Sequence, residues 1–193
     1  IKLTGGEPLT RKECATLVAM LKNLNGIEKV TLTTNGILLG EQMTGLAAAG
    51  IDDINISLDT LDAASFARVT RRENLNQVLE GIEAVLQYPQ IGLKINCVPV
   101  LEGPENLVSV AGLAKKYPLH VRFIEMMPIG YGAAMPCISG PELQARFARR
   151  WPGLHPVEGI AFGDGPAVYY TAPGWKGSIG FITAVHGKFC VSC

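Results

Sequence analysis

The sequence predicts an α/β protein: a partial (β/α) barrel followed by a C-terminal extension that contains β-strands. Three observations carry this prediction. Short β-branched runs alternate with longer helical patterns over the first two thirds of the 193 residues, which is typical of βα units and a parallel sheet. Polar and apolar residues alternate within the strands, which indicates one polar sheet face. Glycine, proline and short strands then replace the βα pattern near the C-terminus.

Each of the five expected βα strands is a short β-branched or apolar run, followed by turn residues and, for the first four, a helical pattern. Glycines end the first two helices, and an Asp-containing stretch can cap the third helical region. Pro104 suits the first turn of the helix that precedes the fifth strand. In chain order, the expected strands are 1–4, 29–34, 54–58, 92–100 and 121–126, and the expected helices are 11–24, 41–49, 59–89 with a break near 70–72, and 104–116.

The pattern changes after the fifth strand. Pro- and Gly-rich sequence over 128–141 predicts a loop, and the PELQARFARRW that follows predicts a helix with proline at its first position. Short strands are expected over 167–171 and 178–184, with APGWKG as the turn between them. We therefore expect a barrel core over 1–136 and an extension over 137–193, together forming one structural unit.

Composition excludes several classes of protein. The 17 Lys and Arg residues balance 17 Asp and Glu residues, so no global field draws the chain to nucleic acid or to anionic lipid. The sequence has no apolar run of about 18 residues and no signal-peptide pattern at its start. We expect a cytoplasmic protein without nucleic-acid or membrane partners. The chain has five cysteines, a low and odd number that argues against a disulfide framework. This favours reduced thiols, metal ligation or both.

Side-chain parity in the strands indicates where a ligand binds. Alternate residues of four strands are polar, and the residues between them are apolar. Because both faces of a parallel sheet are normally covered, a polar face that is not exposed suggests a barrel or curled sheet with a polar ligand in its lumen. An open sheet with a solvated face is the alternative. The polar set is Lys2, Thr4, Thr31, Thr33, Asn35, Asn55, Ser57, Asp59, Lys94 and Asn96, and the apolar set is Leu3, Leu32, Ile54, Ile56, Leu58 and Ile95.

The loop after the first strand, Gly5-Gly6-Glu7-Pro8, is one candidate ligand site. Two glycines let a ligand approach the backbone closely, so that N–H and C=O groups can contact it. Glu7 adds a carboxylate, which suits a ligand ammonium better than a phosphate. A tight strand-to-helix turn with an exposed acid is the alternative interpretation.

Cysteines give the other candidate. Cys190-x-x-Cys193 alone fits half a zinc ribbon, a redox pair or part of an iron–sulfur site. It follows a glycine-rich β segment at the end of the chain, which favours incomplete metal ligation over a redox pair. Cys14 and Cys97 are expected to be small buried hydrophobes, and Cys137 stays open.

With these features placed, the sequence resembles the radical S-adenosylmethionine (SAM) superfamily, and within it the GTP 3′,8-cyclases that begin molybdenum cofactor biosynthesis. The segments that carry the resemblance are IKLTGGEPLTR, LTTNGILL, INISLDTLD, LKINCV, VRFIEMMPIG and GSIGFITAVHGKFCVSC. GGEP alone is a feature of the superfamily, whereas six motifs in order point to the cyclases. The resemblance implies a partial barrel of the radical SAM type.

The resemblance also implies site residues. Lys2 stands where the family more often has arginine, so the charge is kept and the fork geometry is lost. The implied SAM contacts are Gly5, Gly6, Glu7, Ser57 and Met127, the implied GTP contacts are Lys2, Thr33 and Lys94, and the implied ligands of an auxiliary [4Fe–4S] cluster are Cys190 and Cys193.

The implied reaction converts GTP to 3′,8-cyclo-7,8-dihydro-GTP, a lyase reaction with SAM and [4Fe–4S] clusters as cofactors. One electron from a donor would release a 5′-deoxyadenosyl radical, which would abstract the ribose 3′ hydrogen so that the new radical attacks purine C8. The family's CxxxCxxC and third auxiliary cysteine are not among these residues, so we expect part of a longer protein, inactive alone. A homodimer is also implied.

Other interpretations remain open at this point. Another radical SAM enzyme with an auxiliary cluster, such as a peptide-modifying enzyme, would share GGEP and TTNG. A degenerate SAM- or nucleotide-binding barrel would share the fold without the clusters. A zinc-stabilised structural domain at Cys190 and Cys193 is a further alternative.

Overall fold

A computed structural model describes residues 1–100, 104–127, 130, 137–158 and 166–183. The chain divides into two compact units. The first consists of Ile1–Ser57 and Ala63–Ile95, and the second of Leu58–Asp62 and Asn96–Cys193. In the part of the chain that is described, no helix combines the length and apolarity needed to cross a membrane.

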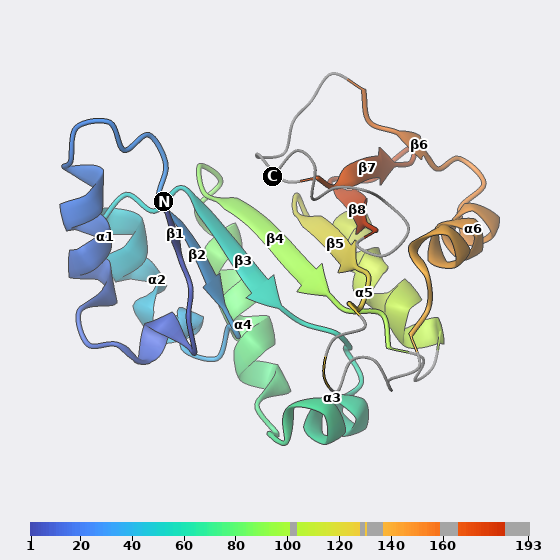
Figure 1. Ribbon diagram of the computed structural model, residues 1–193, viewed down its shortest axis with the longest axis horizontal. Coiled ribbons are helices and arrows are strands. Elements are labelled where there is room, and N and C mark those ends of the chain that lie inside the picture. The colour runs from blue at the N-terminus through green and yellow to red at the C-terminus, as the bar shows by residue number, and fades with distance from the viewer. Residues whose placement is uncertain (101–103, 128–129, 131–136, 159–165, 184–193) are drawn as a thin grey trace. The chain divides into compact units, whose positions relative to one another are not determined.

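The first unit contains the βα alternation predicted for the N-terminal half of the chain (Figure 1). Its strands follow one another in the order of the sequence. The strands are β1 (Lys2–Leu3), β2 (Thr31–Thr34), β3 (Asp53–Ser57) and β4 (Gly92–Cys97), the last of which continues into the second unit at Asn96. The helices are η1 (Pro8–Thr10), α1 (Cys14–Lys22), α2 (Leu39–Ala48), α3 (Ala63–Thr70) and α4 (Leu75–Leu86).

The strand register sets which side chains share a row across the sheet. β1 and β2 run parallel with Lys2 opposite Thr31, and β2 and β3 run parallel with Thr31 opposite Asp53. Two residues further along, Thr33 lies opposite Asn55. Because side-chain direction alternates along a strand, these residues lie on one face of the sheet.

The opposite face carries the core of the first unit. Leu32, Ile54, Ile56 and Ile95 are fully buried, as the parity of the strands predicts. α2 and α4 pack against each other and bury apolar side chains of their own. Burying one such side chain stabilises the fold by about 1.5–3 kcal/mol.

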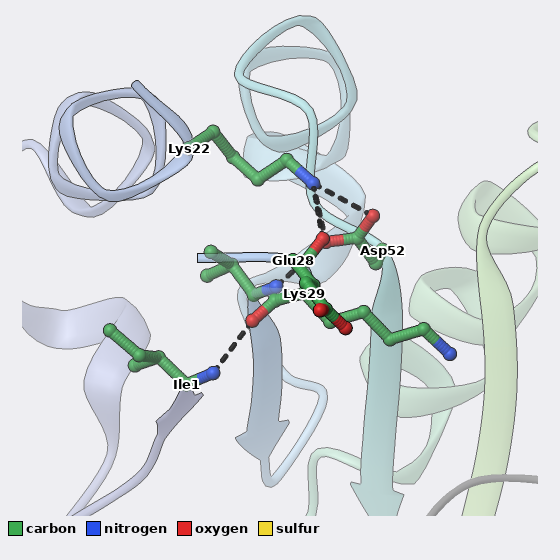
Figure 2. Close-up of polar contacts among 6 residues, drawn as sticks. Ile1, Lys22, Glu28, Lys29 and Asp52 are labelled. Atoms are coloured by element: carbon green, nitrogen blue, oxygen red, sulfur yellow. Dashed lines mark hydrogen bonds and ion pairs between the residues drawn. The ribbon is translucent and has the colours of Figure 1, made fainter. Parts of the chain in front are cut away.

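A polar cluster ties α1 to the chain that enters β2 and β3 (Figure 2). Lys22 Nζ donates to both carboxylate oxygens of Asp52 at 2.9 Å and to the carbonyl oxygen of Glu28 at 3.3 Å. Asp52 Oδ2 also accepts the Val30 N–H at 2.7 Å. Burial favours the neutral form of Asp52, but the Val30 N–H and the Lys22 ammonium outweigh it and lower the pKa of this carboxyl.

The second unit combines one parallel and two antiparallel strand pairs. β8 pairs in parallel with β5 and antiparallel with β7, which pairs antiparallel with β6. Phe123, Phe147 and Phe181 form an aromatic cluster in the core, with ring centroids 5.0 to 6.1 Å apart. The elements are α5 (Pro104–Lys116), β5 (His120–Ile124), α6 (Gly140–Arg150), β6 (His155–Pro156), β7 (Val168–Thr171) and β8 (Ser178–Ile182).

The structure also differs from the expected element boundaries. The helix expected from residue 11 begins at Cys14, because Glu13 has the left-handed φ of 60°. The strand expected over 92–100 ends at Cys97, and the next N–H, that of Val98, donates to the Asp59 side chain. β6 was not predicted, since two residues that include a proline give no strand pattern.

Candidate functional site

The Glu7 carboxylate joins the loop after β1 to the turn after β2. Its Oε1 accepts the Leu9 N–H at 3.0 Å and the Thr34 hydroxyl at 2.7 Å, and its Oε2 accepts the Asn35 N–H at 2.7 Å. A side chain also stabilises the predicted Asn-Gly turn, since Thr34 Oγ1 accepts the Gly36 N–H at 3.1 Å. The GGEP and TTNG motifs are therefore joined by hydrogen bonds between residues 27 and 28 positions apart in the sequence.

Gly5 and Gly6 leave the approach to this loop open. Gly5 has a φ of 141°, a backbone conformation that residues other than glycine rarely adopt. A Cβ built at either glycine has no atom within 4 Å. Both glycines are exposed, and the Glu7 carboxylate, with three donors, keeps acceptor capacity. This loop therefore fits a ligand that carries an ammonium group and contacts the backbone.

Ser57 and Met127, the two other predicted SAM residues, lie at the ends of strands. Ser57 is the last residue of β3 and is exposed. Met127 follows β5 in the second unit, and 53% of its surface is exposed. Each residue thus lies near the carboxyl end of a strand of its own unit, and the carboxyl ends of strands are where ligands bind in folds of this class.

The three predicted GTP residues lie on the polar sheet face of the first unit. We use "polar face" for the side chains of Lys2, Thr31, Thr33, Asp53, Asn55 and Lys94. Lys2 is in the same row as Asp53, and Thr33 is one row further toward the carboxyl ends. Lys94 lies on the next strand in the row of Thr33 and Asn55, and its ammonium reaches back to Asp53 in the first row.

The polar face is buried at Asn55 and Lys94, half-buried at Thr31, Thr33 and Asp53, and exposed at Lys2. Only 9% of the Lys94 side chain and 17% of the Asp53 side chain are exposed. Asn55 is buried, and its Nδ2 donates to the Leu32 carbonyl oxygen at 3.0 Å. A buried ammonium in such surroundings suits an anionic ligand, because its interaction with a phosphate is screened less than at the surface.

Two charged strand residues, Asp53 in the first unit and Arg122 in the second, were missed from the sequence. Asp53 has the same parity as Asn55 and Ser57, but it lies one residue before the strand as predicted. Arg122 on β5 alternates with the buried Val121 and Phe123, and its Nε donates to Asn96 Oδ1 at 2.9 Å. The alternation of polar and apolar residues along each strand was the signal that could have identified both.

A second half-buried carboxylate, that of Asp59, follows β3. Asp59 Oδ1 accepts the Val98 N–H at 2.7 Å. Burial raises the pKa of Asp59, and this hydrogen bond offsets the rise in part. Burial, together with the nearby Asp59 charge, raises the pKa of the Cys97 thiol well above its usual range. Cys97 is therefore a protonated core residue, as predicted, and Cys14 is buried as well.

The predicted cluster ligands Cys190 and Cys193 lie outside the described residues. Among the residues that are described, no three His, Cys, Asp or Glu side chains gather as a metal site. Cys137, for which the sequence gives no role, is half-buried and forms an antiparallel β-bridge with Val100.

Comparison with known proteins gives the family. The family model described as "Radical SAM superfamily" matches residues 1–113. The chain is 43% identical to the GTP 3′,8-cyclase of Moorella thermoacetica and 42% identical to that of Heliobacterium modesticaldum, over all of this chain and 60% of each relative. The resemblance seen in the sequence motifs is thus confirmed. The chain spans about 60% of the length of these relatives.

Solved structures give the fold. A domain of pyruvate-formate lyase-activating enzyme from Bacteroides vulgatus matches with a TM-score of 0.60 at 15% identity, over 77% of this chain and 90% of that one. Streptococcus suis SuiB bound to S-adenosylmethionine matches with a TM-score of 0.62 at 16% identity, over 77% of this chain and 35% of that one. This likeness confirms the predicted α/β partial-barrel class.

Proposed function

Because the chain belongs to the radical SAM superfamily, we propose that it is part of a GTP 3′,8-cyclase of molybdenum cofactor biosynthesis, with SAM and [4Fe–4S] clusters as cofactors. The relatives that span the whole chain at about 40% identity support this proposal. The observation that carries it is the buried Lys94 ammonium on the same polar face as Lys2 and Thr33. A triphosphate is the anion that such a face suits.

The GGEP loop holds the amino-acid end of SAM in this proposal. Gly5 and Gly6 present open backbone, and the Glu7 carboxylate faces the ligand ammonium while its bonds to Thr34 and Asn35 hold it in place. Ser57 and Met127 are further SAM contacts. Bound SAM, cleaved by a reduced cluster, supplies a carbon-centred radical, and this chain supplies position and charge.

The polar face holds GTP. Lys2 and the Lys94 ammonium, which reaches back to Asp53, balance phosphate charge, and Thr33, one row closer to the carboxyl ends than Lys2, donates a hydrogen bond. The phosphates then point toward the amino ends of the strands and the nucleoside toward the carboxyl ends, where the GGEP loop begins. That orientation brings the ribose toward the SAM site. Cys190 and Cys193 are the auxiliary-cluster ligands that this chain contributes.

Reductive cleavage of SAM needs a one-electron donor, so a redox protein or its equivalent is a partner. We place the protein in the cytoplasm and propose that it forms a homodimer.

Substitution of Lys94 by Ala tests the substrate site in the full-length protein. The variant should bind GTP at least tenfold more weakly, since a charge-assisted hydrogen bond contributes about 1.5–3 kcal/mol. SAM affinity should change by less than about twofold, because the SAM residues lie on other strands and loops. Calorimetric titration with each ligand measures both affinities. Equal losses for GTP and SAM would contradict this division of the site.

A further inference from the structure

Lys94 is held by one neighbour. Among the described residues, its Nζ has one partner, Asp53 Oδ1, at 2.5 Å. A lysine ammonium has three N–H donors, so two remain for a ligand. The side chain is mostly buried, and a buried charge requires a partner of opposite sign. Asp53 therefore determines where the ammonium lies before any ligand arrives.

Gly92 makes room for the Asp53 carboxylate. A Cβ built at Gly92 would lie 2.1 Å from Asp53 Oδ1 and 3.0 Å from its carboxyl carbon. Real Cβ contacts are never that short, so any side chain at residue 92 must displace Asp53. Asp53 Oδ1, the oxygen for which Gly92 leaves space, is also the oxygen that accepts the Lys94 hydrogen bond. Three residues on two strands, Asp53, Gly92 and Lys94, thus form one arrangement.

Other charged side chains near these strands have different partners or positions. Asp52, the residue before Asp53, is paired with Lys22. Lys2 is two strands away from Asp53, with Thr31 between them. β4 contains no charged residue besides Lys94. Within the described part of the first unit, Asp53 alone is in ion-pair distance of Lys94.

We propose that Asp53 is a positioning residue for the substrate: it holds the Lys94 ammonium on the polar face so that the two remaining N–H donors meet the phosphates of GTP, and Gly92 is required because it admits the Asp53 carboxylate. This inference rests on the proposed function, since GTP is the ligand. It assigns Asp53 and Gly92 roles that act only through Lys94.

The ion pair with Asp53 lowers the entropy cost of ordering the Lys94 side chain when a ligand binds. A free lysine side chain loses rotamer entropy when it binds a phosphate, whereas Lys94 is already fixed. Asp53 also carries a negative charge, which repels a phosphate and opposes this gain in GTP affinity. Positioning outweighs repulsion, and removal of the carboxylate weakens GTP binding rather than strengthening it.

A double-mutant cycle in the full-length protein tests the proposal. The single variants are Asp53→Ala and Lys94→Ala, and the double variant combines them. Asp53→Ala should weaken GTP binding about tenfold, and the loss should vanish or reverse once Lys94 is already Ala. With clusters reconstituted, Asp53→Ala should raise KM for GTP and leave kcat within about twofold, because Lys94 contacts phosphate and not the reacting atoms.

Gly92→Ala is a second route that leaves both charges in place. It should weaken GTP binding in the same direction, and this loss should also vanish in the Lys94→Ala background. Gly40→Ala, on α2, is the matched control because a Cβ there has no atom within 4 Å. If Asp53→Ala does not fold, Gly92→Ala and the double variant, which carries no unpaired charge, still decide the question.

The binding results distinguish a failure of the positioning role from a failure of the proposed function. If the unaltered protein does not bind GTP, the substrate assignment falls and the positioning role falls with it. If the unaltered protein binds GTP but Asp53→Ala binds it equally or more tightly, only the positioning role is wrong. An equal loss from Asp53→Ala with and without Lys94 would make Asp53 a purely structural residue and would also overturn the inference.

Discussion

Substitution of Glu7 by Gln tests how the GGEP loop binds SAM. Gln keeps the size of Glu but has one acceptor oxygen and a donor NH2 in place of the second oxygen. Three donors point at the carboxylate, two at Oε1 and one at Oε2. If the Gln oxygen faces Leu9 and Thr34, the NH2 group faces the Asn35 N–H, and that donor is left without an acceptor. The other amide orientation loses two hydrogen bonds.

The structure sets the size of the effect. At least one hydrogen bond to a charged acceptor is lost, which costs about 1.5–3 kcal/mol. The charge that faces the SAM ammonium is lost as well. If this cost falls on the loop conformation that SAM requires, the dissociation constant for SAM should rise about 10-fold to 150-fold.

Calorimetric titration of the full-length protein with SAM measures this change. Glu13→Gln is the matched control, since Glu13 is exposed at the start of α1 and makes no capping hydrogen bond there. The control should bind SAM with unchanged affinity. A Glu7→Gln protein that binds SAM as tightly as the unaltered protein would refute the role of the carboxylate.

Two further predictions concern the stability of the full-length protein, followed by urea denaturation between about pH 3 and pH 8. Asp52→Asn should lower the free energy of unfolding by about 1 kcal/mol at neutral pH. Its folded pKa is lowered, so this stabilisation is lost as the pH falls through the folded pKa, and the deficit should shrink below about pH 4; a constant deficit would contradict the ion-pair explanation. Asp59→Asn keeps an acceptor for the Val98 N–H and removes a buried charge, so it should raise the free energy of unfolding at neutral pH. Because the folded pKa of Asp59 is raised, the gain should fade as the pH falls toward the ordinary value; a less stable variant at neutral pH would refute this.

Much of the first unit could be predicted from the sequence because its patterns are local. Strand parity identified the buried apolar face, including Leu32, Ile54 and Ile95, and glycines marked the ends of helices. The break between α3 and α4 followed from the loss of helical periodicity near 70–72. These features depend on a few neighbouring residues, which one sequence displays directly.

Features that depend on residues far apart in the sequence could not be predicted in the same way. The bonds from Thr34 and Asn35 to Glu7 join two motifs whose contact requires the register of β1 and β2. The pairing of Lys94 with Asp53 requires a neighbouring strand whose alignment no local pattern gives. The parallel pairing of β8 with β5 likewise joins segments that are more than 50 residues apart.

The resemblance to a family named the site residues, and the structure adds how they are held. Glu7 was expected as a ligand contact, and its three hydrogen bonds explain why it is fixed in position. Lys94 was expected as a phosphate contact, and Asp53 and Gly92 explain its placement. Supporting residues of this kind do not carry a motif, since their identity depends on one neighbour.

The most direct test of the central claim is a turnover assay on the full-length protein, with iron–sulfur clusters reconstituted and reduced and with SAM and GTP supplied. The proposed function predicts that 5′-deoxyadenosine and 3′,8-cyclo-7,8-dihydro-GTP appear together and that both depend on GTP. Cleavage of SAM without any cyclised nucleotide would contradict it and would assign the polar face to another substrate.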